Sequence, residues 1–318
     1  MENIQISTLP PVITEIPRDP DGNPAIVYLT SLPARSGRRT QNQVLNTIAS
    51  WLGGTIETVE WGNIRFQHAT AIKSRILDSG YSPATARKML SALRGTLRSA
   101  WKLGQMNAED LAKALDLGKV TGSSLPQGRF ITAEEIEKLF KVCTDDHGNI
   151  GARDAALLAV LYGCGLRREE VTTLNVRDYN VTESTLLVHG KRDKERTAYT
   201  PNGIGEALNA WLTIRGTEPG ALFLAVSSAG TLRPQRITPD EIYKVVEKRI
   251  KPAGLEHFYP PSLRRSFCSN LLDLGVDVIT TSKLMGHSNV QTTMLYDKRQ
   301  DTAQRLGAEM LTIPYHQG

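Results

Sequence analysis

Five side chains of the kinds used in phosphate chemistry stand at the ends of predicted elements in the C-terminal half of this chain. Guanidinium groups hold phosphate oxygens by paired hydrogen bonds, a lysine or a histidine can move a proton, and a tyrosine phenol can act as a nucleophile. The five residues are Arg167, Lys191, Arg264, His287 and Tyr296.

Each of these residues also has an ordinary structural explanation when it is taken alone. Arg167 could form an ion pair with Glu170 at a helix start, Lys191 could solvate a hairpin turn, and Tyr296 could be a half-buried aromatic residue. Residue type by itself therefore does not decide between a functional and a structural role.

The order and spacing of the surrounding motifs are far more specific. Arg167 precedes Lys191 by 24 residues, Arg264 precedes His287 by 23, and His287 precedes Tyr296 by 9. In these motifs the chain resembles the tyrosine recombinases, the lambda-type phage integrase family. The matching stretches are Tyr162-Gly163-Cys164-Gly165-Leu166-Arg167-Arg168-Glu169-Glu170-Val171, Gly190-Lys191-Arg192-Asp193-Lys194-Glu195-Arg196, Ser262-Leu263-Arg264-Arg265-Ser266-Phe267, Leu284-Met285-Gly286-His287-Ser288, and Thr292-Thr293-Met294-Leu295-Tyr296.

The resemblance implies a role for each of the five residues. Arg167 and Arg264 would hold the non-bridging oxygens of a DNA phosphate, where negative charge develops during attack. Tyr296 would be the nucleophile that forms a 3'-phosphotyrosyl bond, and neighbouring cations are expected to ease the deprotonation of its phenol. Lys191 would protonate the departing 5'-oxygen, and His287 would hydrogen-bond the phosphate or assist proton transfer.

The same resemblance implies that Glu170 orients Arg167 and that the reaction uses no cofactor, neither a metal ion nor ATP. A phosphotyrosyl bond conserves the energy of the phosphodiester, so ATP is not required. The sequence is consistent with this expectation because it has no Gly-x-x-x-x-Gly-Lys loop and no clustered metal-ligand pattern.

One position departs from the family pattern. The family usually has a histidine three residues before the second arginine, and Pro261 stands there in this chain. One phosphate contact is therefore unassigned, and His257 or Tyr259 could reach the same space. An isolated histidine before a proline turn is more often a surface or packing residue, which favours the structural interpretation of His257.

Composition limits the remaining classes of protein. The 318 residues carry a net charge of +5 and are 40% hydrophobic, which excludes wholesale disorder and predicts about two domains. The longest nearly apolar run, residues 155–166, is too short to span a bilayer. We expect a cytoplasmic protein with three reduced, buried cysteines, Cys143, Cys164 and Cys268.

The predicted fold is mainly α with a small β-sheet. Residues 1–39 are rich in proline and predict a loosely ordered arm, residues 40–117 a helical core-binding domain, residues 118–130 a linker, and residues 131–318 an α+β tyrosine-recombinase catalytic domain. Thr132 and Glu135 form a capping box at the start of the last domain. In that domain we also expect a buried helix at 153–162, strands at 185–188 and 196–200, and helices at 239–249, 262–274 and 280–285.

The helix predicted to begin at Ser82-Pro83 has two distinct faces. Leu90, Leu93, Leu97 and Trp101 share an apolar face, while the basic residues fall elsewhere. No acidic residue occurs between positions 79 and 108, so we interpret the basic face as a surface for the DNA backbone. Its residues are Arg87, Lys88, Arg94, Arg98 and Lys102.

The sequence therefore predicts a site-specific recombinase or integrase that cleaves and rejoins double-stranded DNA through a Holliday junction. We expect a homotetramer on DNA, with an accessory DNA-bending protein as a further partner and residues 301–311 as an assembly segment. Two alternatives remain open at this stage: a type IB topoisomerase-like enzyme and a non-catalytic DNA-binding protein on the same scaffold.

Overall fold

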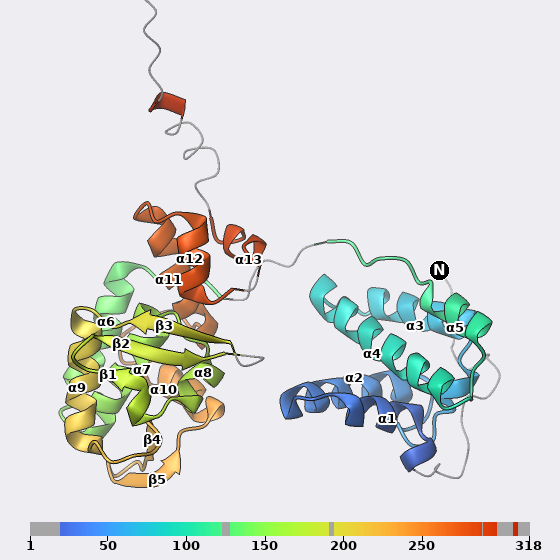
Figure 1. The fold of residues 1–318 in the computed structure, drawn as a ribbon, viewed down its shortest axis with the longest axis horizontal. Helices are drawn as coiled ribbons and strands as arrows, with labels where there is room; N and C mark the ends of the chain where they lie inside the picture. The colour runs from blue at the N-terminus through green and yellow to red at the C-terminus, as the bar shows by residue number, and fades with distance from the viewer. Residues whose placement is uncertain (1–19, 123–127, 191–193, 288, 298–307, 311–318) are drawn as a thin grey trace, which may run out of the picture. The chain divides into compact units, whose positions relative to one another are not determined.

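The chain divides into two compact units, residues 1–124 and 125–318. The computed structural model describes residues 20–122, 128–190, 194–287, 289–297 and 308–310. Helices predominate, with a few short strands in the second unit, which confirms the predicted fold class (Figure 1). The three cysteines are free and buried, as predicted. No helix in the described ranges is long and apolar enough to cross a membrane.

The first unit is a helical bundle around one apolar core. Its longest helix, α4 (Pro83–Lys102), begins where the Ser82 hydroxyl accepts the Thr85 N–H at 3.3 Å, with Pro83 at the first helical position. Leu93 and Leu97 are fully buried, whereas Trp101, one turn further along the same face, is 45% exposed because the buried part of that face ends before it. The bundle's other elements are η2 (Pro20–Gly22), α1 (Pro24–Ser31), α2 (Arg35–Trp51), η3 (Trp61–Asn63), α3 (Phe66–Asp78) and α5 (Ala108–Leu115).

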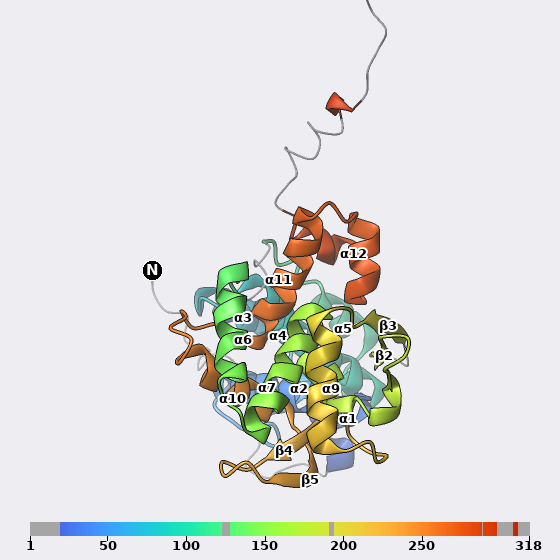
Figure 2. The same ribbon diagram turned by 90° about the vertical axis from the view of Figure 1, so that its left-hand side faces the viewer.

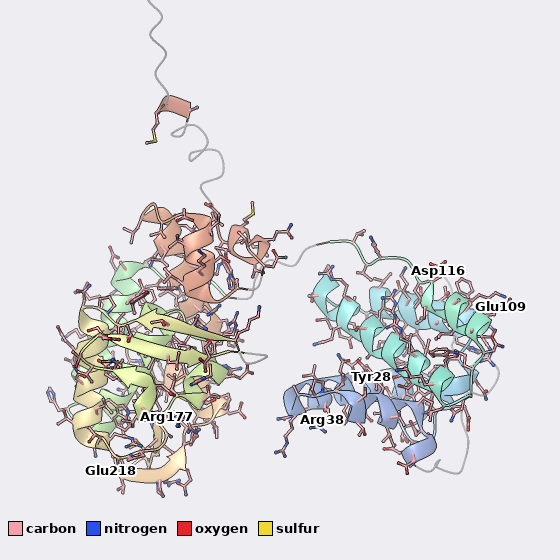
Figure 3. The ribbon with its side chains drawn as sticks, in the orientation of Figure 1. Tyr28, Arg38, Glu109, Asp116, Arg177 and Glu218 are labelled. Atoms are coloured by element: carbon pink, nitrogen blue, oxygen red, sulfur yellow. The ribbon has the colours of Figure 1, made fainter. Side chains whose placement is uncertain are left out.

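The loosely ordered arm predicted for residues 1–39 is wrong from residue 20 onward, and residues 1–19 lie outside the described residues. Asn23 caps α1 by accepting the Ala25 N–H at 2.9 Å, while its buried amide donates to the Ile56 carbonyl at 3.0 Å. Pro24 occupies the first helical position, which needs no N–H. Tyr28 of α1, labelled in Figure 3, packs directly against Gly95 of α4, where a Cβ atom would collide with its ring.

Helix α7 (Asn149–Gly163) forms the centre of the second unit. Residues 156–161 are all buried, as the apolar pattern predicted. The helix packs against α6 (Ala133–Thr144), α9 (Gly203–Arg215) and α11 (Pro260–Asp273), and Figure 2 shows α6, α7 and α9 side by side. Helix α6 begins at the predicted capping box, where the Thr132 hydroxyl accepts the Glu135 N–H and the Glu135 carboxylate accepts the Thr132 N–H.

The strands of the second unit form two small antiparallel sheets. One has the order β1-β2-β3 and includes both predicted strands, with Val188 of β2 opposite Arg196 of β3; the other pairs β4 with β5. The strands are β1 (Tyr179–Asn180), β2 (Thr185–His189), β3 (Glu195–Tyr199), β4 (Leu224–Val226) and β5 (Leu232–Arg236). The remaining elements are α8 (Arg168–Thr173), η4 (Val176–Asp178), α10 (Pro239–Ile250), α12 (Val278–Met285) and α13 (Gln291–Met294).

Candidate active site

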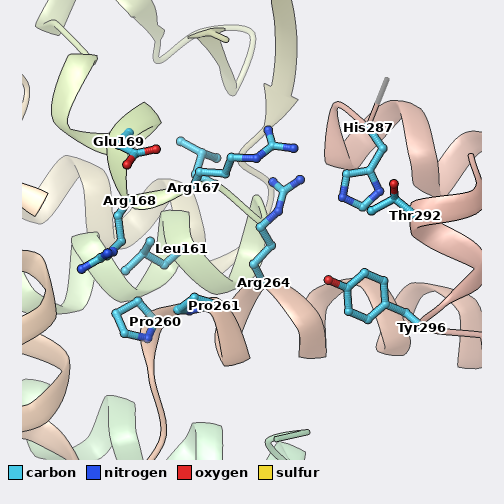
Figure 4. A pocket seen from close by; sticks show the side chains of 11 residues that line it. Leu161, Arg167, Arg168, Glu169, Pro260, Pro261, Arg264, His287, Thr292 and Tyr296 are labelled. Atoms are coloured by element: carbon cyan, nitrogen blue, oxygen red, sulfur yellow. The ribbon is translucent and has the colours of Figure 1, made fainter. Parts of the chain in front are cut away.

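Four of the five predicted catalytic side chains line one pocket of the second unit. Arg167 comes from the start of α8, Arg264 from α11, His287 from the end of α12, and Tyr296 from just after α13 (Figure 4). We call this cavity of about 420 Å³ the cationic pocket. Its other lining residues are Leu161, Leu166, Arg168, Glu169, Pro260, Pro261 and Thr292.

Arg167 is held in place by Glu170, one turn further along α8. The Arg167 Nη1 donates to Glu170 Oε1 at 2.6 Å, and the Arg167 backbone N–H donates to Glu170 Oε2 at 2.9 Å. Burial opposes ionisation of Glu170, but hydrogen bonds from Arg196 and from Arg167 outweigh it and lower the pKa to about 2. Glu170 is therefore an anion that fixes one guanidinium at the edge of the pocket.

Arg264 is only 9% exposed and its guanidinium is held from two sides. One nitrogen donates to the Gly165 carbonyl and the other to the Met285 carbonyl at 2.5 Å. Burial, followed by the charge of Arg167, lowers the Arg264 pKa to about 9, which still leaves it cationic at neutral pH. The described lining of the pocket has three arginines, Arg167, Arg168 and Arg264, against the single carboxylate of Glu169, and this excess of positive charge makes it an anion site.

His287 follows the left-handed C-cap of α12, Gly286, whose φ is 61°. Its Nδ1 lies 2.8 Å from the hydroxyl of the buried Thr293. Burial lowers the His287 pKa to about 4, with further contributions from Arg264 and Arg167. The imidazole is therefore neutral at physiological pH and can accept a proton.

We expect His287 in the DNA-free protein to titrate near pH 4 rather than near 6.5. Because the folded pKa is depressed, neutral His287 supports folding above about pH 6.5, and this support is lost as the pH falls toward 4. An NMR titration of the imidazole C2 proton measures the midpoint, and the His287→Gln variant assigns the signal. A midpoint near 6.5 would show that the ring is neither buried nor close to the arginines that the structure places around it.

Tyr296 directs its phenol oxygen toward the Arg264 side chain (Figure 4). Its ring packs with Cys268 and Met285 and stacks on His287, with ring centroids 6.4 Å apart and an interplanar angle of 20°. Burial raises the Tyr296 pKa more than Arg264 lowers it. The neighbouring cations do lower the Tyr296 pKa, as expected, but in the DNA-free protein burial outweighs them and the net shift is upward.

The position of the missing histidine has no replacement among the pocket's lining residues. Pro261 itself lines the pocket and is exposed. His257, the substitute considered from the sequence, does not line the pocket. Its Nε2 is 3.6 Å from Glu247 Oε1, and its ring packs edge-to-face with Tyr259, with ring centroids 4.7 Å apart. Tyr259 in turn stacks on Tyr243 and does not line the pocket.

Lys191 lies outside the described residues, as do residues 301–307 and 311 of the predicted assembly segment. On α4, two of the predicted DNA-contacting residues already have backbone partners. Arg87 donates to the Gly122 carbonyl at 2.9 Å, and Arg94 to the Gly118 carbonyl at 3.3 Å. Among the described residues no hydrogen bond or ion pair engages the remaining basic residues of this face, Lys88, Arg98 and Lys102, all of which are exposed.

Two residues that support the pocket were not assigned a role from the sequence: Arg196, which contacts Glu170, and Thr293, which contacts His287. A signal for Arg196 was available. It shares one face of β3 with Ala198, which is buried, and a charge on the inward face of a strand requires a partner. Thr293 gave no comparable signal, because a threonine is common in a short helix.

The sequence of this chain matches a known protein family and individual members of it. A family model described as the phage integrase family matches residues 129–303. The tyrosine recombinase XerC of Proteus mirabilis is 31% identical over 257 residues, covering 79% of this chain and 80% of that protein. The tyrosine recombinase XerC of Corynebacterium glutamicum is 30% identical over 231 residues, covering 69% of each.

Solved structures of related fold include the Tn1549 transposon integrase in complex with a circular intermediate DNA, with a TM-score of 0.67 and 14% identity over 91% of this chain and 99% of that one. XerH site-specific recombinase bound to a palindromic difH substrate has a TM-score of 0.64 and 20% identity, and the match covers 93% of this chain and 98% of that one. A lambda integrase tetramer bound to a Holliday junction has a TM-score of 0.62 and 14% identity, and the match covers 87% of this chain and 76% of that one. At these identities the likeness is one of fold.

Proposed function

The chain belongs to the phage integrase family of tyrosine recombinases, and on that basis we propose that it is a site-specific recombinase that cleaves and rejoins DNA through Tyr296. The second unit is the catalytic domain and the first is the core-binding domain. One observation carries the proposal: the Tyr296 phenol, the guanidiniums of Arg167 and Arg264, and the neutral imidazole of His287 line the same pocket of one chain.

The cationic pocket suits attack on a DNA phosphate. Arg167 and Arg264 bind the two non-bridging oxygens, and their charge stabilises the additional negative charge of the transition state. The Tyr296 oxygen attacks phosphorus, forms the 3'-phosphotyrosyl bond and displaces the 5'-oxygen. Rejoining reverses these steps with a 5'-hydroxyl of the partner strand, and a Holliday junction lies between the two strand exchanges.

Two protons must move in the cleavage step. The Tyr296 phenol, whose pKa is raised by burial, is protonated in the free protein, so its proton leaves as the attack proceeds. We assign the neutral His287 ring, whose centroid lies 6.4 Å from that of Tyr296, as the acceptor, because a bound phosphate offsets the arginine charges that lower its pKa. Lys191 supplies the proton that the leaving 5'-oxygen requires. This assignment of Lys191 rests on its place in the motif between β2 and β3.

The partner is double-stranded DNA, with the reaction run by a tetramer on two duplexes and assisted by an accessory DNA-bending protein. The lambda integrase structure, a tetramer on a Holliday junction, supports this arrangement by analogy of fold. A plasmid carrying two copies of the native target tests the proposal. A recombinase yields deletion or inversion products, whereas relaxation of supercoils without such products would indicate a topoisomerase-like enzyme instead.

The exposed basic residues of α4 are expected to bind the DNA backbone. Replacing Lys88, Arg98 and Lys102 together by alanine removes three cations that no described residue engages by a hydrogen bond or ion pair. The plot of log affinity against log salt should therefore become shallower by about 0.9 for each lost phosphate contact. Binding to DNA fragments across a salt series measures this slope. Lys113→Ala removes a charge paired with Glu109 at 2.6 Å and is the matched control. An unchanged slope in the triple variant would exclude α4 from the interface.

Pro261 leaves room for one further phosphate contact. Replacing it by histidine places an imidazole on the rim of the cationic pocket and should accelerate cleavage of a nicked DNA site about 10-fold, which corresponds to about 1.4 kcal/mol, close to the value of one hydrogen bond to a charged group. Pro261→Ala controls for loss of the proline ring, because its methyl group cannot hydrogen-bond to a phosphate. A Pro261→His rate at or below that of the alanine variant would show that this pocket does not use the contact.

A further inference from the structure

Arg196 of β3 contacts three residues that lie close to the cationic pocket: Glu170, Leu284 and Gly286. Its Nη2 donates to Glu170 Oε2 at 2.9 Å, and its Nε donates to the Leu284 carbonyl near the end of α12 at 3.2 Å. Its guanidinium also packs against Gly286, where an added Cβ would come within 3.0 Å of it. One side chain from β3 thus touches α8 and the turn that carries His287.

The location of Arg196 excludes direct contact with substrate as its main role. Its side chain is 13% exposed, and it is absent from the lining of the cationic pocket. Each neighbour of its guanidinium, however, lies next to a residue that does line the pocket. Glu170 holds Arg167, Gly286 directly precedes His287, and Leu284 lies three residues before it.

The contacts of Glu170 show what Arg196 contributes. The buried carboxylate accepts bonds from Arg167 Nη1, the Arg167 backbone N–H and Arg196 Nη2. Without Arg196, Oε2 would keep only the backbone N–H. A buried carboxylate that loses a charged donor reorients or takes up a proton, and either change weakens its hold on Arg167.

We propose that Arg196 is a positioning residue for catalysis: by holding Glu170 and the end of α12 together, it acts with the direct bond from Arg167 Nη2 to the Gly286 carbonyl at 3.4 Å to set the separation between the Arg167 guanidinium and the His287 ring before DNA binds. The proposal rests on the function proposed above. Misplacing a catalytic group by about 1 Å can reduce a rate by about 10²-fold, so the effect should appear in the chemical step. DNA affinity, which depends on many backbone contacts, should change little.

The test measures single-turnover formation of the covalent adduct on a nicked DNA site, together with DNA affinity and thermal stability, for four proteins: wild type, Arg196→Gln, Glu170→Gln and the double variant. Each single variant should slow adduct formation by about 10²-fold, with DNA affinity within about two-fold of wild type. If Arg196 acts through Glu170, the double variant should be about as slow as the slower single variant. Effects that multiply to about 10⁴-fold, or a wild-type rate in Arg196→Gln, would overturn the proposal.

Two further variants separate positioning from loss of stability. Arg196→Lys keeps the charge, and its single ammonium cannot serve both Glu170 and Leu284 along the same directions, so its rate should fall between those of wild type and Arg196→Gln. If Arg196→Gln does not fold, Arg196→Lys replaces it as the test variant. A wild-type rate in Arg196→Lys would refute positioning by the guanidinium. Arg215→Gln removes donors to the Ala221 and Gly216 carbonyls elsewhere in the unit and should leave the rate unchanged.

The adduct formed by the wild-type protein distinguishes failure of the proposed function from failure of the proposed role of Arg196. If wild type forms no adduct on its native site, the proposed function fails. If wild type forms the adduct and Arg196→Gln forms it equally fast, only the role of Arg196 fails.

Discussion

Tyr296→Phe is expected to abolish covalent adduct formation and recombination, with a loss of at least about 10⁴-fold, because no second tyrosine, serine or cysteine is among the described residues that line the pocket. The substitution removes a single oxygen and keeps the ring that packs on Cys268 and Met285. The structure describes no hydrogen bond to the phenol oxygen from the residues it covers, so the fold should be unaffected. DNA binding should therefore persist while chemistry is lost.

The measurement is incubation with a nicked DNA site followed by denaturing electrophoresis, in which the wild-type adduct migrates as a slower band. Tyr259→Phe, an exposed tyrosine outside the pocket, is the matched control and should form the adduct normally. A persistent adduct in Tyr296→Phe would mean that a different side chain attacks the phosphate.

Arg264→Gln is expected to slow cleavage by about 10³-fold, the upper range for removing one preorganised donor group from an oxyanion site. Its effect on stability should be much smaller. Burial and the charge of Arg167 lower the Arg264 pKa to about 9, which shows that the folded protein disfavours this cation. Removing it relieves that penalty and offsets the lost hydrogen bonds to Gly165 and Met285.

Single-turnover rates and thermal melting, measured on the same preparations, separate these two effects. Arg264→Lys should recover only part of the rate, because an ammonium cannot hold a phosphate through a bidentate fork. Arg215→Gln again serves as the control for removal of a structural arginine. A large drop in melting temperature with a cleavage rate close to wild type would assign Arg264 to the fold rather than to the chemistry.

Most of the pocket could be predicted from the sequence because its chemistry is encoded in short motifs. Arg167 and Glu170 are neighbours on one helical turn, and His287 and Tyr296 are brought together by a short helix. Local signals also predicted several helix starts, such as the Ser82 cap and the box at Thr132 and Glu135. Such signals depend on bonds within three or four residues, which a sequence displays directly.

The features that could not be predicted depend on contacts between distant residues. Arg196 meets Glu170 at a separation of 26 residues and Leu284 at 88. Helix α1 was missed although Asn23 and Pro24 give it the same kind of local start as Ser82 and Pro83 give α4, because the surrounding prolines indicated a loose arm. The bond that fixes Asn23 to Ile56, 33 residues away, could not be predicted. The raised pKa of Tyr296 had the same origin, since its burial against Cys268 follows from tertiary packing.

The central claim is that the Tyr296 oxygen becomes bonded to the phosphorus held by Arg167 and Arg264. Peptide mapping by mass spectrometry of the adduct trapped on a nicked DNA site tests it most directly. The predicted result is a 3'-phosphonucleotide attached to the peptide that contains Tyr296, with the 5'-hydroxyl strand released. Attachment to any other residue, or a 5'-phosphate linkage, would contradict the account.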